Sequence, residues 1–174
     1  MKLSVPHYSQ YLDIQDSFWM LRSCGGLCLK MVVEYHGKVF SDFISFCNEA
    51  KEIGGYHLQN GWVHDYLVAK AEGFGLQAYR KEGLTSLDEV ISSLEAGNPV
   101  IISVEKRVLE QTRFHMIVLT GFESVTTHTP QPTTYFYYHE TESTDKEKGQ
   151  FRKCDRETLM HYWRGKAIFI TKVD

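Results

Sequence analysis

Residues 24–35 read CGGLCLKMVVEY and residues 115–122 read HMIVLTGF. In the first stretch, apolar residues recur every three or four positions and Gly37 follows as a stop, which predicts an amphipathic helix. The second stretch is the most apolar β-rich run of the chain. We therefore expect a helix that begins at Cys24 and a core strand that His115 opens, and the rest of the fold is built outward from these two elements.

The two halves of the chain differ in character. Around the Cys24 helix, the pattern predicts an irregular lead-in over 1–20, a loop over 54–61, a strand over 76–80 and helices over 42–50, 62–72 and 86–96. Ser41 or Asp42 would cap the first of these helices, and Ser86 with Glu89 would form a capping box on the last. The second half predicts strands over 100–104, 115–122, 135–140, 151–154 and 167–172, loops over 124–134 and 141–149, and a short helix over 155–163. Helices followed by an antiparallel sheet indicate an α+β fold, taken as a single domain over 1–174.

Composition excludes several classes of protein. The chain has 174 residues, 43% hydrophobic and 13% aromatic, which is typical of a globular domain. A net charge of -3 gives no field that would attract nucleic acid or an anionic membrane. Neither a signal-peptide core nor a membrane-spanning run is present, so we expect a cytoplasmic protein. The four cysteines show no CxxC pair and no zinc-ligand spacing, so we expect reduced thiols, no metal and no cofactor.

Cys24 and His115 are the candidate catalytic residues. A thiolate at a helix N-terminus is stabilised by unpaired N–H groups and by the helix dipole, and the glycines at 25 and 26 would let a substrate backbone approach. A histidine at the end of a core strand can face a cleft and act as a base if a thiol lies within reach. The alternatives are a buried structural cysteine and a hydrogen-bonded histidine at the edge of the sheet.

Two further residues would complete such a site. Glu140 ends the strand after His115, so its carboxylate would orient the imidazole if the two strands pair. Glu142, Asp145 and His139 compete for this role, because sequence does not fix the register. The side-chain amide of Gln10, on the lead-in, would join the Cys24 backbone N–H in an oxyanion hole.

Three segments together resemble a known family. They are VPHYSQYLDIQDSFWMLRSCGGLCLKMVVEYHG from Val5, GGYHLQNGWVHDYLVAKAEGFGLQAY from Gly54, and GNPVIISV from Gly97 followed by HMIVLTGFE. In order and spacing they are similar to the bacteriocin-processing, double-glycine leader peptidases and their stand-alone relatives. The resemblance implies a bacterial papain-like cysteine peptidase that acts on a peptide, with Cys24 as nucleophile, His115 as base and Gln10 in the oxyanion hole.

The chain departs from the family pattern at two places. Relatives carry an aspartate in an (N/D)-D-P turn where this chain has His139-Glu140-Thr141, and they often carry proline at position 26. An acyltransferase on the same site and a peptide-binding module without turnover therefore stay open, and a redox or metal-binding protein is the weakest alternative. We expect Trp19 and Trp62 in the core and His64-Asp65 as a surface pair.

Overall fold

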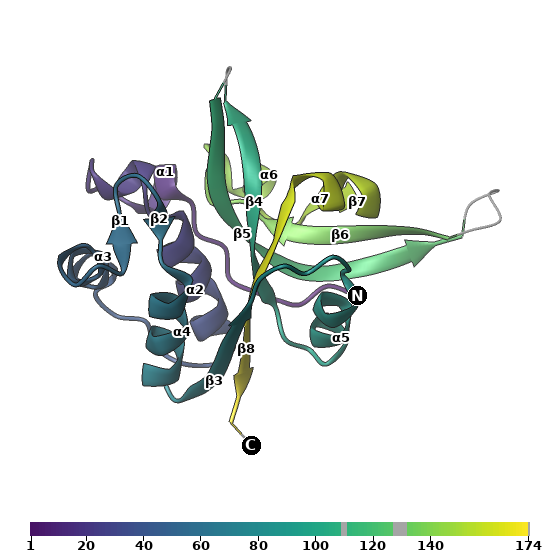
Figure 1. The fold of residues 1–174 in the computed structure, drawn as a ribbon, viewed down its shortest axis with the longest axis horizontal. Helices are drawn as coiled ribbons and strands as arrows, with labels where there is room; N and C mark the ends of the chain where they lie inside the picture. Colours follow the sequence, from purple (N-terminus) through teal and green to yellow (C-terminus); the bar gives the residue numbers. More distant parts are fainter. Residues whose placement is uncertain (109–110, 127–131, 174) are drawn as a thin grey trace.

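The sheet is the centre of the molecule, and all of its strand pairs are antiparallel. The computed structural model describes residues 1–108, 111–126 and 132–173. The strands are β1 (Tyr56–His57), β2 (Gly61–Trp62), β3 (Leu76–Lys81), β4 (Val100–Val108), β5 (Gln111–Val125), β6 (Thr133–His139), β7 (Arg152–Asp155) and β8 (Trp163–Lys172). Six of them form one sheet in the order β3-β8-β4-β5-β6-β7, and β1 pairs with β2 separately (Figure 1).

Helices cover both faces of the six-stranded sheet. They are α1 (Gln10–Asp13), the 3-10 helix η1 (Trp19–Leu21), α2 (Cys24–Tyr35), α3 (Phe43–Glu52), α4 (His64–Gly73), α5 (Asp88–Glu95), α6 (Lys146–Gly149) and α7 (Arg156–Tyr162). The N-terminal group α1 to α4 gathers on one side, and α5 and α7 lie on the other (Figure 1). The predicted α+β, papain-like arrangement of a helical half against an antiparallel sheet is confirmed.

Strand alternation explains how one sheet serves two cores. Successive side chains of a strand point to opposite faces. Ile101 and Val118 therefore pack in the core under α2, α3 and α4, whereas Ile102 and Leu119 pack in the core under α5 and α7. Because both faces are covered, the central strands are apolar along most of their length, as the run at 115–122 indicated.

Several predicted boundaries were wrong because of side-chain contacts that local patterns do not show. The lead-in contains α1, which Ser9 caps, and the predicted loop over 141–149 contains α6, which Asp145 caps. The helix expected from Trp62 begins at His64, because Trp62 pairs with Tyr56 in the small sheet.

The two predicted helix caps have different outcomes. Asp42 caps α3 as expected, since its side chain accepts a hydrogen bond from the Ser45 backbone N–H. The capping box of Ser86 and Glu89 is wrong: α5 has no side-chain cap, and the Glu89 carboxylate binds Lys81 and Tyr79 on the neighbouring strand. Part of the predicted loop over 124–134 lies outside the described residues.

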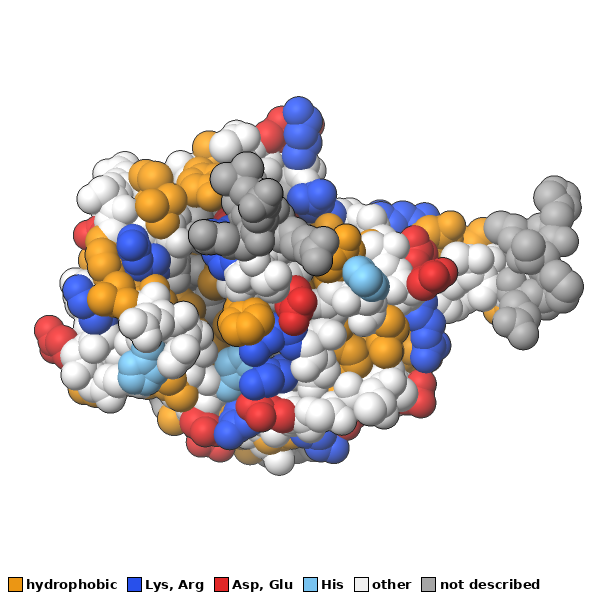
Figure 2. Space-filling view, turned by 45° about the horizontal axis from the view of Figure 1, so that its top comes forward, with side chains coloured by type: hydrophobic (Ala, Val, Ile, Leu, Met, Phe, Trp, Pro, Cys, Tyr) orange, Lys and Arg blue, Asp and Glu red, His pale blue; other side chains and the backbone are white. Residues whose placement is uncertain are grey.

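None of the described helices has the length and hydropathy needed to cross a membrane. On the face shown in Figure 2, blue and red side chains are interspersed, so neither sign of charge dominates it.

Candidate active site

Cys24 is the first residue of α2, as predicted. Ser23, the residue before Cys24, makes no side-chain cap, so the N–H groups of the first turn of α2 remain available near the sulfur. Cys24 is partly exposed, whereas Cys28, one turn later, is completely buried. Burial, with the nearby Cys24, raises the pKa of the Cys28 thiol well above its usual range. The helix therefore presents one accessible sulfur and keeps the second inert in the core.

The two glycines after Cys24 serve packing, and approach of a substrate backbone to them stays a prediction. A methyl group added to Gly25 would lie 2.7 Å from Cγ of Trp62 and 2.8 Å from the sulfur of Met116. At Gly26 it would lie 3.0 Å from Phe46. The side chains of the core already occupy this space, so the glycines allow α2 to start close against Trp62.

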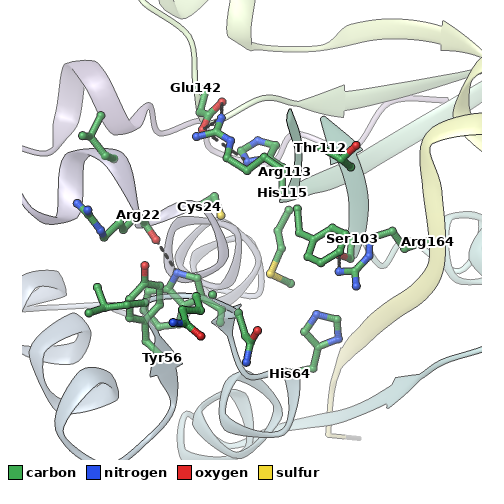
Figure 3. Close-up of a pocket in the computed structure, with 18 residues that line it drawn as sticks. Arg22, Cys24, Tyr56, His64, Ser103, Thr112, Arg113, His115, Glu142 and Arg164 are labelled. Carbon is green, nitrogen blue, oxygen red and sulfur yellow. Dashed lines mark hydrogen bonds and ion pairs between the residues drawn. The ribbon is translucent and has the colours of Figure 1, made fainter. Parts of the chain in front are cut away.

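His115 lies inside β5 and does not open it, contrary to the prediction. The strand begins at Gln111, because β4 and β5 pair as a long hairpin with Lys106 opposite Arg113 and Val104 opposite His115. The His115 side chain is buried, yet it lines the same cavity as Cys24 (Figure 3). Its ring hydrogen-bonds the Glu140 carboxylate, and Cys24 is close enough to raise the pKa of the imidazole.

Glu140 lies behind the imidazole. Strands β5 and β6 pair in antiparallel register, and Glu140 follows directly after β6. Its Oε1 atom is 2.6 Å from Nε2 of His115, and its Oε2 atom is 3.0 Å from Nζ of Lys106. Since Nε2 is used by the carboxylate, Nδ1 is the ring nitrogen left for the Cys24 thiol.

The three competing partners of His115 have other positions. The His139 ring bonds the Val5 carbonyl and accepts from the Phe151 N–H, and Asp145 caps α6. Glu142 is the nearest competitor, with Oε1 3.9 Å from Nδ1 of His115. The carboxylate in hydrogen-bond contact with the imidazole is that of Glu140.

The charges of the site favour a protonated imidazole. Burial alone would lower the pKa of His115, but the nearby Cys24 and the hydrogen bond to Glu140 outweigh burial and raise the pKa to about 9. Burial would raise the pKa of Glu140, yet the contacts with His115 and Lys106 hold it well below its usual range. These directions are those of a carboxylate–imidazolium pair next to a thiol.

Sequence reasoning missed the cations that hold the two acids. Lys106 bridges Glu140 and Glu142, and Arg113 also binds Glu142. For Arg113, period-two alternation was the available signal, since it lies two residues before His115 in β5. No motif linked Arg113 or Glu142 to Lys106 before the register of the β4–β5 hairpin was known.

Gln10 is completely buried, and both the nitrogen and the oxygen of its side-chain amide form hydrogen bonds. Nε2 donates to the Met20 carbonyl over 3.0 Å, and Oε1 accepts from the Thr141 hydroxyl over 2.7 Å. Gln10 is not among the residues that line the cavity of Cys24. Its role as an oxyanion donor stays a prediction.

A cavity of about 470 Å³ joins the site to the surface. Figure 3 shows Cys24 at its centre, between Arg22 and Tyr56 on one side and Ser103 and Arg164 on the other. Trp19 is in the core as expected. Trp62 is nearly buried but also lines the cavity, where its Nε1 donates to the Arg22 carbonyl.

The prediction that His64 and Asp65 form a surface pair is wrong for His64. Asp65 is exposed and binds Arg80, whereas His64 turns into the cavity (Figure 3). Burial and nearby cations lower the pKa of His64 below its usual value.

One group of side chains has the composition of a metal site. Among the described residues, His115, Glu140 and Glu142 offer ligand atoms that lie within 4.8 Å of one another. Lys106 and Arg113 already bind both carboxylates, so a cation would have to displace them.

Comparison with known proteins identifies the family. Residues 2–166 match the model of the Peptidase_C39 like family, which covers nearly the whole chain. The chain belongs to this family. Membership places it among peptidases, in agreement with the resemblance that the sequence showed. Comparison with curated proteins found no match.

Solved structures share the fold. The chain is similar to a double glycine motif protease from an AMS/PCAT transporter, crystallised in complex with the leader peptide, at 16% identity and a TM-score of 0.63, covering 99% of this chain and 94% of that one. It is also similar to the peptidase domain of Streptococcus ComA, a bifunctional ABC transporter involved in a quorum-sensing pathway. Here the identity is 16% and the TM-score 0.58, with 88% of this chain and 93% of that domain covered.

Proposed function

We propose that this member of the Peptidase_C39 like family is a cysteine peptidase with Cys24 as nucleophile, His115 as general base and Glu140 as the residue that orients the imidazole. One observation carries the proposal: Cys24 and His115 line the same cavity, Cys24 is near enough to raise the pKa of the imidazole, and Nε2 of that ring lies 2.6 Å from the Glu140 carboxylate. A nucleophile, a base and an orienting acid in hydrogen-bond series are the arrangement that thiol acylation requires.

Acylation follows from this order of contacts. His115 takes the proton of Cys24, and the thiolate attacks the carbonyl carbon of the peptide bond. The bond between carbon and nitrogen then breaks, and the imidazolium gives its proton to the leaving amine. A thioester joins the acyl part of the substrate to Cys24.

Deacylation uses the same groups in reverse. His115 removes a proton from water, which attacks the thioester, and the acid product leaves as the thiol of Cys24 is restored. The oxyanion of each tetrahedral intermediate would be bound by the Cys24 backbone N–H at the start of α2, and by the Gln10 amide if one of its hydrogens faces the sulfur. Lys106 holds Glu140 in place behind the ring.

A peptide is the substrate class with the best support. The family is a peptidase family, and one structural neighbour was crystallised with a leader peptide. An extended peptide also suits an open cavity with polar and aromatic walls. Cytoplasmic location and bacterial origin remain predictions.

Trapping of the acyl-enzyme tests this function. The full chain would be incubated with a library of short peptides carrying C-terminal thioesters or amides, then quenched in acid and examined by intact mass spectrometry. We expect a mass adduct on Cys24 that is absent from Cys24→Ala and fails to form in His115→Gln.

The fate of the adduct separates the open alternatives. Loss of the adduct to water indicates a hydrolase, and faster loss when amines are added indicates an acyltransferase. Peptide binding by the wild type with no adduct and no product at any pH would show a binding module and would refute the proposed peptidase.

A further inference from the structure

The walls of the cavity carry more positive than negative charge. Among the described residues, Arg22, Arg113 and Arg164 line it, with Glu142 as the single carboxylate. Glu142 is already bound by Arg113 and by Lys106. Two cations, one on each side of Cys24, therefore remain without a carboxylate partner within 4.0 Å among the described residues (Figure 3).

Arg164 is the better held of these two cations. Its Nη1 atom donates to the Ser103 hydroxyl over 3.0 Å, and its guanidinium stacks on the Phe114 ring at 3.4 Å from the centroid. Ser103 is itself buried, so the hydrogen bond anchors one end of the group. The remaining N–H groups of a guanidinium form a planar fork suited to a carboxylate.

The surroundings of Arg164 also lack a compensating charge. Partial burial lowers its pKa, and Glu105 and Glu82 oppose this only from beyond ion-pair distance. Glu82 already forms ion pairs with Arg80 and Lys166. A half-buried cation of this kind gains more from an incoming anion than an exposed one does, because its hydration is already reduced.

His64 lies next to this cation on the wall of the cavity. It is the first residue of α4, and its Nδ1 atom is buried with no hydrogen-bond partner among the described residues. A neutral imidazole N–H also donates to a carboxylate, more weakly than a guanidinium does. The His64 ring lines the cavity, so the Arg164 wall carries an imidazole beside the guanidinium, and the opposite wall carries Arg22, whose Nη1 donates to the Phe18 carbonyl.

We propose that Arg164 and His64 form a subsite for a carboxylate of the peptide, so that the enzyme prefers substrates with an acidic group on one side of the scissile bond. This proposal rests on the proposed peptidase function and specifies its substrate class. The carboxylate has two possible sources, an aspartate or glutamate side chain or the free C-terminus of a short peptide.

Peptide binding to the full-length Cys24→Ala variant tests the subsite without turnover. One set of probes is N-acetylated, C-amidated octapeptides of glycine and alanine with a single glutamate moved through every position, each matched by a glutamine peptide. A second set has no acidic side chain but ends in a free carboxylate at successive lengths. Calorimetry then gives the ratio of dissociation constants for each matched pair.

We expect glutamate to bind about tenfold or more tightly than glutamine at one position or two neighbouring positions, which is the range for a charge-assisted hydrogen bond. Arg164→Gln should bring this ratio close to one, and Arg164→Lys should keep part of it. The matched control is Arg80→Gln, which removes an exposed arginine bound to Asp65 outside the cavity and should leave the ratio unchanged. A preference confined to the second set would assign the subsite to a chain terminus.

Equal binding of glutamate and glutamine at every position, with no preference for a free terminus, would overturn the inference, as would the absence of binding by both sets. This conclusion needs no variant, so a poorly folded Arg164→Gln would not obscure it. The two proposals also fail separately. A glutamate preference without any acyl-enzyme would refute the peptidase alone, and acyl-enzyme formation without the preference would refute the subsite alone.

Discussion

Replacing Glu140 by glutamine removes a negative charge from behind His115 and keeps the size of the side chain. In the wild type the pKa of His115 is raised from 6.5 to about 9, which corresponds to about 3 kcal/mol in favour of the protonated ring. Cys24 and Glu140 share this effect and also offset the cost of burial. We therefore expect Glu140→Gln to lower the pKa of His115 by at least about one pH unit, or ~1.4 kcal/mol.

The same substitution should affect stability with a defined sign. The pKa of His115 is higher in the folded state than in the unfolded state. Protonation of His115 therefore adds to the free energy of unfolding. This contribution is complete below pH 6.5 and is lost as pH rises toward 9. The wild type should thus lose stability across this window, and Glu140→Gln should lose less. At pH 6 the variant should be less stable by about 3 kcal/mol, the lower end for breaking a buried ion pair.

Two measurements follow the change. Nuclear magnetic resonance of histidine Cε1–H groups gives the titration of His115, assigned with a His115→Gln sample, and urea unfolding at several pH values gives the free energy. Glu123→Gln is the matched control, since Glu123 pairs with Lys153 on the surface away from the site. If His115 titrates identically in Glu140→Gln and in the wild type, Glu140 does not act on the imidazole and the proposed triad is wrong.

Three other substitutions or conditions give clear expectations. Gly25→Ala places a methyl group 2.7 Å from the indole of Trp62. It should therefore lower the free energy of unfolding by about 1–3 kcal/mol and slow the alkylation of Cys24. The control Gly73→Ala, which has open space around the added methyl group, should change little. Burial lowers the pKa of His139 from 6.5 to about 4, so the fold holds the neutral ring. The free energy of unfolding should therefore fall by up to ~3 kcal/mol as pH drops from 6.5 to 4. The same pH dependence of unfolding in His139→Asn would contradict this. Thr141→Val removes a buried hydroxyl that donates over 2.7 Å, and urea unfolding should show a loss of about 1–3 kcal/mol.

Much of the fold could be predicted because its elements follow hydrophobic periodicity. The helix at Cys24 and the strand around His115 are buried on several sides, so their apolar patterns are strong. The failures have specific causes. Glu89 bonds to an adjacent strand instead of its own helix end, and Trp62 pairs with Tyr56 across a short loop. Both contacts are tertiary and leave no local trace.

The candidate site shows the same division. Cys24 could be singled out because helix position and chemistry coincide in one short motif, and His115 because it accompanies the most apolar strand. The choice of Glu140 over Glu142 depends on the register of β5 and β6, because a shift of one residue would turn the side chains of β6 to the opposite face of the sheet. Arg164 and His64 come from distant segments, and only the folded chain brings them to one cavity.

The rate at which iodoacetamide alkylates Cys24, measured between pH 5 and 9 by peptide mass spectrometry in the wild type and in His115→Gln, tests the central claim most directly. A thiolate stabilised by the imidazolium of His115 predicts that at pH 6.5 the wild-type Cys24 reacts about tenfold or more faster than a small free thiol, and that His115→Gln abolishes this advantage. Equal rates in the two proteins, both rising only near the titration of a free thiol, would show that Cys24 and His115 do not form a reactive pair.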